Sequence, residues 1–335
     1  MSDAPSGARV AEAPAPLLAS LFATRRRSYV QACFITIYLV WGVSYAVGRI
    51  MATELPPLLA AGVRFCFSGT LLTLLAYASG LTLPTRARDW RLIGAAALLG
   101  IAVSNGLNVL ALQHVASSQV ALISASSAFW IAWTGMYGRH PTPVNRRTWL
   151  GLLVGFVGVA ILVSAHGVGL HARFGWQLVV LGSALAWALA TAAIRESQPE
   201  CDPLAFTAGY LLVGGVTLAA MGLLTGDAGR WSWSPTGLAA MVFLAIFSST
   251  LAFLAYTYLL RHEPPARIGT YAYVNPLVAV FAGWVLLDER LNPLQWAGTA
   301  VIFAGVVLVR NPRLFPRLRP PRRARSFVDV PIDRR

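Results

Sequence analysis

Ten apolar blocks, each of about 20 residues, constrain the fold of this chain more than any other feature of its sequence. They are separated by short segments rich in Arg, Pro and Gly, and they span residues 30–52, 57–79, 91–112, 117–137, 147–165, 175–195, 203–225, 235–260, 266–287 and 292–310. A helix needs about 20 residues to cross a hydrocarbon core of about 30 Å. Backbone amides in lipid need partners within the protein, and the short alternating pattern of a barrel is absent. The sequence therefore predicts an all-α integral membrane fold with ten transmembrane helices.

Composition supports a lipid-facing surface. The chain is 56% hydrophobic and only 12% charged, with a mean hydropathy of +0.61, whereas soluble domains carry about 25% charged residues. The net charge is +14, which in a soluble protein would suggest nucleic acid. Here the Arg residues sit in short loops and a tail, the pattern that holds membrane proteins in one orientation. We therefore expect a lipid bilayer and no nucleic acid as partner.

The distribution of Arg predicts the orientation. With the N-terminus placed inside, most Arg residues that flank the spans lie on the inner side. The outer loops carry Arg173, Arg230 and Arg290, with Arg49 close by at a span end. This asymmetry predicts a multi-pass protein of the cell (inner) membrane with both termini in the cytoplasm.

The two ends of the chain lie outside the apolar blocks. Residues 1–29 are rich in Ala and Pro and are interpreted as a disordered cytoplasmic leader. Residues 311–335 form a basic cytoplasmic tail, expected to bind anionic lipid. A regulatory or partner-binding tail is the alternative.

The two halves of the sequence resemble each other. Trp41 and Arg49 precede Trp187 and Arg195 by 146 residues. Further matches, at offsets of 146 to 148, are Pro57 with Pro203, Gly151 with Gly298, Gly158 with Gly305, and His114 with His262. A repeat of five spans is odd, so the second copy enters the membrane from the opposite side. We predict two inverted five-helix repeats, over residues 30–165 and 174–310, with a solute site between them.

Several short motifs point to one family. They are Trp41-Gly42-Val43-Ser44-Tyr45 before Arg49, Pro57 followed by Arg64, Trp149-x-Gly151, Asn275-Pro276-Leu277, Asp288-Glu289-Arg290-Leu291 and Trp296-x-Gly298. In these motifs the chain resembles the drug/metabolite transporter superfamily, specifically EamA-type transporters with two EamA repeats. The resemblance implies ten helices, cytoplasmic termini, and export of metabolites, amino acids or drugs by alternating access.

The first half departs from the family pattern in two places. Ser127-Ala128-Phe129 stands where the repeat predicts a proline like Pro276, and Arg139-His140 stands where the family usually places a glutamate. These departures concern the gating of the first half, not the fold.

Arg64 is the main candidate for binding a substrate. It lies well inside the second span, and a guanidinium within the membrane is normally paired or faces water. We expect it to bind a carboxylate or another anionic group. The alternative is a structural Arg that donates to helix carbonyls. Its counterpart in the second repeat is Tyr210, a further candidate.

Polar and aromatic residues in other spans are expected to line the same cavity. They are Trp41, Asn105, Asn108, Ser127, Trp130, Trp187, Tyr271, Tyr273 and Asn275. Packing between helices is the alternative for each of them. Pro276 is expected to kink its helix. Arg49 and Arg195 either reach the interface or form gating salt bridges, for which Glu54 and Glu196 are near in sequence.

The sequence shows no catalytic or metal-binding pattern. The three Cys have no metal-ligand spacing, and every acidic residue and His falls outside the middle of a span. We therefore predict no enzyme activity, no cofactor and no metal, and a carrier that works by facilitated diffusion or exchange. An integral membrane enzyme and a non-transporting sensor or scaffold are the alternatives. The oligomeric state, monomer or homodimer, stays open.

The predicted orientation can be tested with tags at residues 1 and 335. Because ten spans return the chain to the side from which it started, both tags should be protected in intact cells and reachable in inverted vesicles. Tags found on opposite faces of the membrane would contradict an even number of spans.

Overall fold

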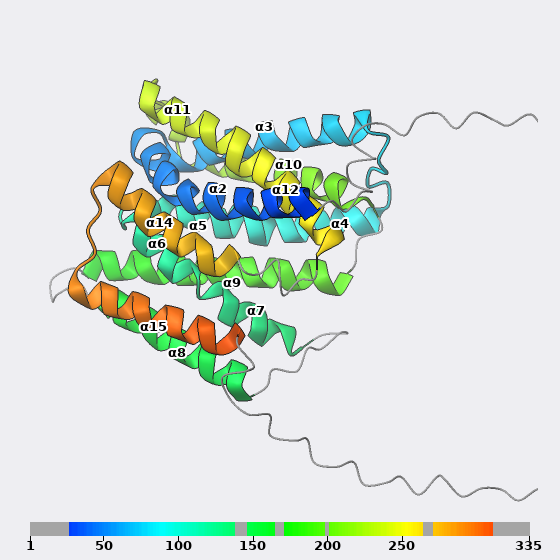
Figure 1. Ribbon diagram of the computed structural model, residues 1–335. Coiled ribbons are helices and arrows are strands. Elements are labelled where there is room, and N and C mark those ends of the chain that lie inside the picture. Colours follow the sequence, from blue (N-terminus) through cyan, green and yellow to red (C-terminus); the bar gives the residue numbers. More distant parts are fainter. Residues whose placement is uncertain (1–26, 138–145, 165–170, 198–200, 264–270, 311–335) are drawn as a thin grey trace, which may run out of the picture.

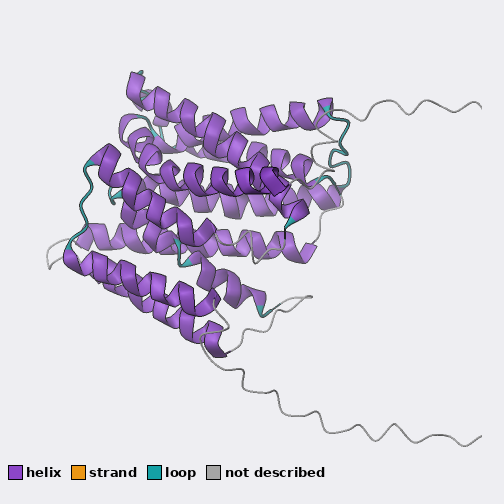
Figure 2. Cartoon of the chain, in the orientation of Figure 1, coloured by secondary structure: helices purple, strands orange, loops and turns teal. Residues whose placement is uncertain are grey.

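The computed structural model describes residues 27–137, 146–164, 171–197, 201–263 and 271–310. Within these ranges every regular element is a helix (Figure 2), which confirms the predicted all-α membrane fold. The predicted leader and basic tail lie outside the described residues, except that the first helix already begins at Arg27.

The helices follow the ten predicted spans. The first half comprises α2 (Arg27–Glu54), α3 (Pro57–Ala78), α4 (Ala87–Ala97) with η1 (Leu98–Asn105) and α5 (Gly106–Leu112), α6 (Ser117–Ser124) with α7 (Ser127–Gly135), and α8 (Arg146–Ser164). The second half comprises α9 (His171–Ser197), α10 (Pro203–Leu224), the short η2 (Asp227–Arg230), α11 (Pro235–Phe243) with η3 (Leu244–Leu251) and α12 (Ala252–His262), α14 (Tyr271–Leu287) and α15 (Pro293–Arg310). Among the described residues, six continuous helical spans are long and apolar enough to cross a membrane.

Proline and small polar residues set several helix starts. Proline stands at the first position of α3, α10, α11 and α15, where its missing N–H costs no helical hydrogen bond. Two of these starts are also capped by side chains. Asp202 accepts from the amide of Leu204 at 2.9 Å, and Ser234 accepts from that of Gly237 at 3.3 Å.

The two halves have opposite directions in the membrane. In Figure 1, α2 runs from right to left, whereas its counterpart α9 runs from left to right. The first described helix begins, and the last one ends, toward the same right-hand side of the bundle. Both features are those of an inverted repeat with an even number of spans.

Two helices of each half pack along their own counterparts. The pairs are α3 with α10 and α8 with α15, and glycines mark the closest approaches. A Cβ on Gly69 would lie 2.5 Å from the Leu212 nitrogen, and one on Gly215, which is 146 residues further on, would lie 2.5 Å from the Cys66 nitrogen. Gly158 and Gly305 make the same kind of approach between α8 and α15. Small residues let helix backbones touch in lipid.

Each half contains a π-helical segment at the same place. η1 and η3 are both eight residues long and are separated by the repeat offset of 146. In each segment a side chain donates to the carbonyl five residues earlier, Asn105 to Gly100 and Thr250 to Ala245, both at 2.9 Å. The sequence predicts regular helices here, so the π segments are a correction. They often mark functional sites.

The fourth span differs from its prediction as a single helix over 117–137. It breaks between α6 and α7, where Ser126 and Phe129 donate through their amides to carbonyls three residues earlier. No proline or glycine causes the break. This stretch carries Ser124, Ser126 and Ser127, but the hydroxyls of Ser124 and Ser126 have no hydrogen-bond partner among the described residues, so the break is not explained by serine side chains bonding the backbone.

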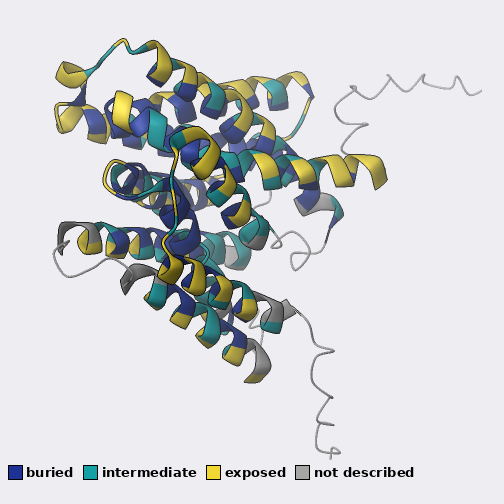
Figure 3. Ribbon diagram, turned by 60° about the vertical axis from the view of Figure 1, so that its left-hand side comes forward, coloured by how far each residue is buried: buried dark blue, intermediate teal, exposed yellow. Residues whose placement is uncertain are grey.

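Burial separates a packed interior from an apolar exterior. Buried positions face the inside of the bundle, and exposed positions lie on its outside (Figure 3). Many of the exposed residues are large and apolar, for example Leu224 with 88% of its surface exposed and Phe281 with 62%. Such a surface suits contact with lipid.

Gly69→Ala should destabilise the fold, because the added methyl group collides with the backbone of α10 at Leu212. We expect a loss of about 1–3 kcal/mol, measured as a lower midpoint of thermal unfolding in detergent. Gly182→Ala is the matched control, since nothing lies within 4 Å of its added methyl group. An equal midpoint in the two variants would contradict a close contact between α3 and α10.

Candidate functional site: a cavity between the two halves

A cavity of about 180 Å³ lies inside the bundle. Its walls come from α2, α3, η1, α5, α6 and α7 of the first half and from α9, η3, α12 and α14 of the second. Nine of the residues singled out from the sequence line it: Trp41, Arg64, Asn105, Asn108, Ser127, Trp187, Tyr271, Asn275 and Pro276. The structure thus brings most of the candidates together, although their role in binding stays a prediction.

Many polar side chains stand among the apolar residues of the lining, which is almost uncharged. It includes Ser44, Ser104, Ser124, Ser127, Ser183, Ser248 and Ser249. Arg64 is the one lining side chain with a charge among the residues that the structure describes. A ligand in this cavity would therefore meet many hydrogen-bonding groups and a single cation.

Arg64 is buried without a compensating anion. Only 7% of its surface is exposed, and its Nε has no hydrogen-bond partner. No ion pair joins it to any of the acidic groups in the described ranges. Its guanidinium lies 4.3 Å from the ring centroid of Phe65. A buried charge without a partner is costly. An anion bound to this guanidinium would offset that cost.

The turn that follows Arg64 is fixed to the π segment of the other half. The Ser68 hydroxyl lies between two carbonyls, and it is 2.8 Å from that of Arg64 and 2.9 Å from that of Ala245 in η3. This contact ties α3 to the part of the eighth span that lines the cavity. The backbone of α3 that carries Arg64 is therefore bonded to η3.

An aromatic wall stands on another side of the cavity. The Trp41 ring packs against Phe253, Tyr256 and Tyr271, with centroids 5.4, 5.4 and 5.1 Å away. Its indole nitrogen donates to the carbonyl of Ser248 in η3 at 3.2 Å. Trp41 thus connects the first helix of one half to the π segment of the other.

The three asparagines have different surroundings. Asn105 donates to Gly100 within its own helix. Asn275 donates to the carbonyls of Tyr38 at 3.3 Å and Tyr271 at 3.1 Å when its amide is assigned the orientation that satisfies both of its groups. By contrast, the Oδ1 of Asn108 is buried with no partner, which leaves an acceptor available to a ligand.

Two candidates, Tyr210 and Trp130, are not among the lining residues, and a third, Tyr273, cannot be placed. The hydroxyl of Tyr210 lies where a Cβ on Gly100 would be, 2.0 Å from that position, so its ring fills space against η1. Trp130 packs with Phe129, Trp133 and Phe156. Tyr273 belongs to α14, but its side chain is outside the described residues.

Arg49 forms contacts at one end of the bundle, here named the Arg49 end, where α2 ends and α3 and α6 begin. It donates to the carbonyl of Val115 at 2.5 Å and lies 3.7 Å from the carboxylate of Glu289. Arg49 thus forms an ion pair, but its partner is Glu289 in the loop between α14 and α15 and not Glu54, the acid near it in sequence. A role in gating stays a prediction.

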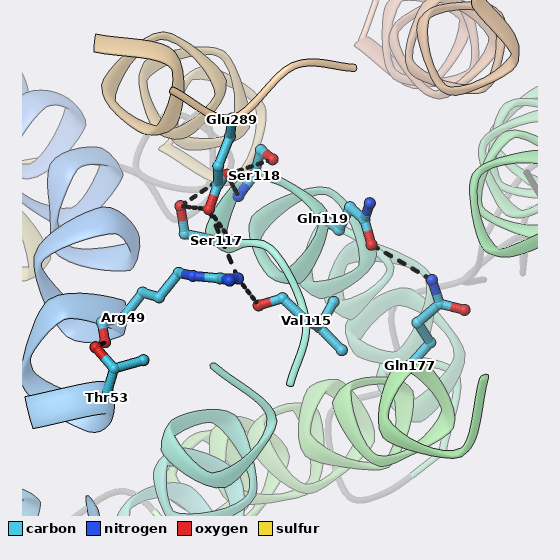
Figure 4. A network of polar contacts seen from close by, with 8 residues as sticks. All are labelled: Arg49, Thr53, Val115, Ser117, Ser118, Gln119, Gln177 and Glu289. Atoms are coloured by element: carbon cyan, nitrogen blue, oxygen red, sulfur yellow. Dashed lines mark hydrogen bonds and ion pairs between the residues drawn. The ribbon is translucent and has the colours of Figure 1, made fainter. Parts of the chain in front are cut away.

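Glu289 is the centre of a network that Figure 4 shows. Its carboxylate accepts from the amides of Ser117 and Ser118 at 2.7 and 3.0 Å. It also accepts from their hydroxyls, at 3.0 Å from Ser117 and 2.7 Å from Ser118. Next to it, Gln177 of α9 donates to Gln119 of α6 at 3.4 Å. The first turn of α6 is thus bonded to two elements of the second half.

Arg195 and Pro276 lie elsewhere. Arg195 is in the last turn of α9, and Pro276 lies inside α14 and lines the cavity. Their predicted roles in gating stay predictions.

Sequence reasoning missed several lining residues. Tyr45 and Gly48 follow Trp41 at helical spacing, and Ser183 precedes Trp187 by one turn, so periodicity could have found them. Ser248 and Ser249 lie in a π segment, where helical spacing gives no guide. Within the described residues, no three His, Cys, Asp or Glu side chains gather to hold a metal.

Comparison with known proteins identifies the family. A family model described as the EamA-like transporter family matches residues 30–164 and again residues 174–311. The chain belongs to the EamA-like transporter family. This EamA-like protein is therefore a membrane transporter, and members of its family are transporters rather than enzymes.

Relatives of this EamA-like transporter come from several kingdoms. It is 34% identical to the uncharacterized inner membrane transporter YedA of Escherichia coli K12, over 84% of this chain and 90% of the relative. It is 26% identical to the uncharacterized transporter YvbV of Bacillus subtilis, over 82% and 89%. A WAT1-related chloroplastic protein of Arabidopsis thaliana is 23% identical, over 83% and 68%.

One solved crystal structure has a similar fold. It superposes with a TM-score of 0.64 at 19% identity, over 85% of this EamA-like chain and 99% of the other. At this identity the likeness concerns the fold alone.

Trp41→Phe should lower the free energy of unfolding by about 1–3 kcal/mol, because the Ser248 carbonyl loses its donor in the interior. Trp130→Phe is the matched control, since its buried indole nitrogen has no hydrogen-bond partner to lose. Chemical unfolding in detergent measures both variants. Equal losses would show that the Trp41 hydrogen bond does not hold α2 to η3.

Proposed function

We propose that this chain is a carrier that exports small carboxylate-bearing metabolites, amino acids among them, by alternating access. The observation that supports this most directly is the unpaired, buried guanidinium of Arg64 in a cavity between the two halves. A carboxylate would restore the missing partner, through two parallel hydrogen bonds where geometry allows.

The remaining groups of the cavity suit the rest of such a molecule. The free acceptor on Asn108 can take an N–H of an amine or amide. The wall formed by Trp41, Phe253 and Tyr271 can cover an apolar side chain. The volume of about 180 Å³ is below the range of about 300–1,000 Å³ typical of drug-sized ligands. A small metabolite fits these properties better than a large drug.

The inverted repeat supports alternating access. Two similar halves that face opposite ways can exchange conformations around a site between them. We assign the Arg49 end to the outside of the cell, because the loops predicted at that end carry few Arg residues. With that orientation, both termini are cytoplasmic. The export direction is the one implied by the resemblance to EamA-type transporters.

The cavity suggests a mechanism without proton coupling. None of the lining residues that the structure describes is an acid or a histidine. A carrier of this kind would move its substrate by facilitated diffusion or exchange.

Arg64→Ala should lower the initial rate of export at least about tenfold, because a charged hydrogen bond to the substrate is lost. The measurement is efflux of labelled amino acids and carboxylic acids from proteoliposomes. Arg64→Lys should recover only part of the rate, since Lys keeps the charge but not the planar fork. Arg290→Ala is the control, because its side chain is 78% exposed and lies outside the cavity.

Three outcomes would contradict the proposal. Wild-type rates for every substrate in a correctly inserted Arg64→Ala variant would make Arg64 structural. Substrate binding without any flux would favour a sensor. Transport that requires a pH gradient at zero membrane potential would rule out facilitated diffusion and exchange.

A further inference from the structure

We propose that Glu289 is a latch that closes the Arg49 end of the cavity, and that breaking it opens this end while leaving the fold intact. The inference rests on the proposed alternating access. It assigns a role to a residue of the loop between α14 and α15 that does not itself line the cavity.

The network lies directly beyond the cavity on three elements. Gly48 lines the cavity, and Arg49 is the next residue of α2. Leu112 lines it at the end of α5, with Val115 three residues further on, and Ala121 lines it one helical turn after Ser117. A turn of helix advances about 5.4 Å. The network therefore covers the cavity at this end.

The latch joins the two halves through one carboxylate. Glu289 comes from the second half, whereas Ser117, Ser118 and Arg49 come from the first. Four hydrogen-bond donors and one cation converge on it, and only 9% of the Glu289 side chain is exposed. A path through this end would have to separate α6 and α2 from the α14–α15 loop, and every one of these contacts would then break.

The local backbone is built to hold this carboxylate. Asp288 has a φ of 49°, in the left-handed region, and turns the chain after α14. The next amide, that of Glu289, donates back to the carbonyl of Gly283 at 3.1 Å. A Cβ on Gly283 would lie 2.6 Å from the Glu289 Oε2 and 3.2 Å from the Ser117 hydroxyl. Glycine at 283 thus leaves the space that the carboxylate occupies.

The first half has no acid to form the equivalent latch. Residue 142, at the repeat offset of 147 from Glu289, is a threonine, and residues 138–145 contain neither Asp nor Glu. The contact of Glu289 with the start of α6 therefore has no acid to repeat it at the corresponding positions of the first half. Its loss should shift the population of the two states toward opening at this end.

The test measures access to the cavity and needs no substrate. In a chain with Cys33, Cys66 and Cys201 replaced by alanine, Ser124→Cys places a thiol on the cavity wall. A membrane-impermeant methanethiosulfonate is applied to either face of the membrane in sealed vesicles. Ala228→Cys, in the exposed η2 helix, reports in a parallel sample which face carries the Arg49 end.

The reagent is applied from the face that carries residue 228. From this face, Glu289→Gln should raise the labelling rate of the thiol in Ser124→Cys at least about tenfold. Gly283→Ala should do the same, because its methyl group displaces the carboxylate without changing any charge. Arg290→Gln is the matched control. It alters the neighbouring residue, whose partner is Asp288 rather than Glu289, and it should leave the rate unchanged.

Unchanged labelling from that face in both latch variants would overturn the inference, and so would an equal rise in Arg290→Gln. A thiol at the fully buried Ala188 monitors unfolding. If this thiol also becomes reactive in Glu289→Gln, that variant has unfolded. The labelling rate of Ser124→Cys in the Gly283→Ala variant then decides whether the latch exists. Absent transport combined with the expected labelling would refute the proposed carrier function but support the latch.

Discussion

Contact between the backbones of repeat-related helices is the constraint on which the structure depends. In lipid no hydrophobic driving force brings helices together, so close packing has to do so. Gly69 and Gly215 between α3 and α10, and Gly158 and Gly305 between α8 and α15, allow this contact. Because each of these four helices pairs with its own counterpart, the two halves are held face to face. The remaining spans then enclose a cavity between them.

The two halves are similar in backbone but different in chemistry. Arg64 and Tyr210 occupy matching positions, yet Arg64 presents a charge to the cavity while Tyr210 fills space against Gly100. Glu289 bonds the start of α6, whereas the corresponding segment of the first half carries no acid. Symmetry thus supplies the framework, and its departures place Arg64 in the cavity and Glu289 against the first turn of α6.

The sequence predicts the fold well, because lipid imposes the length and polarity of every span. The repeat offset also locates Trp41 and Trp187, which both line the cavity. The offset misleads at Tyr210, since alignment with Arg64 does not reveal that η1 leaves room there for a large ring. The polar and aromatic character of the fourth span predicts that Trp130 lines the cavity. In the structure its ring packs with other aromatic rings instead.

Other features could not be predicted from local patterns. The role of Glu289 depends on serines 171 and 172 residues away, and only the folded chain brings them together. The break near Ser126 occurs without proline or glycine. The π segments occur at the same offset in both halves. Aligning the two repeats therefore shows no insertion that would reveal them.

The paired π segments have a consequence for how this cavity can diverge among related chains. A residue in an α-helix turns the chain by about 100°, but a π turn takes up one residue more than an α turn over the same rotation. Deleting one residue within η1 would therefore restore a regular helix and leave Asn108 facing the cavity, and the equivalent deletion in η3 would leave Phe253 in place. A gap of a single residue in either segment is therefore compatible with an unchanged cavity lining beyond it in a relative of similar length.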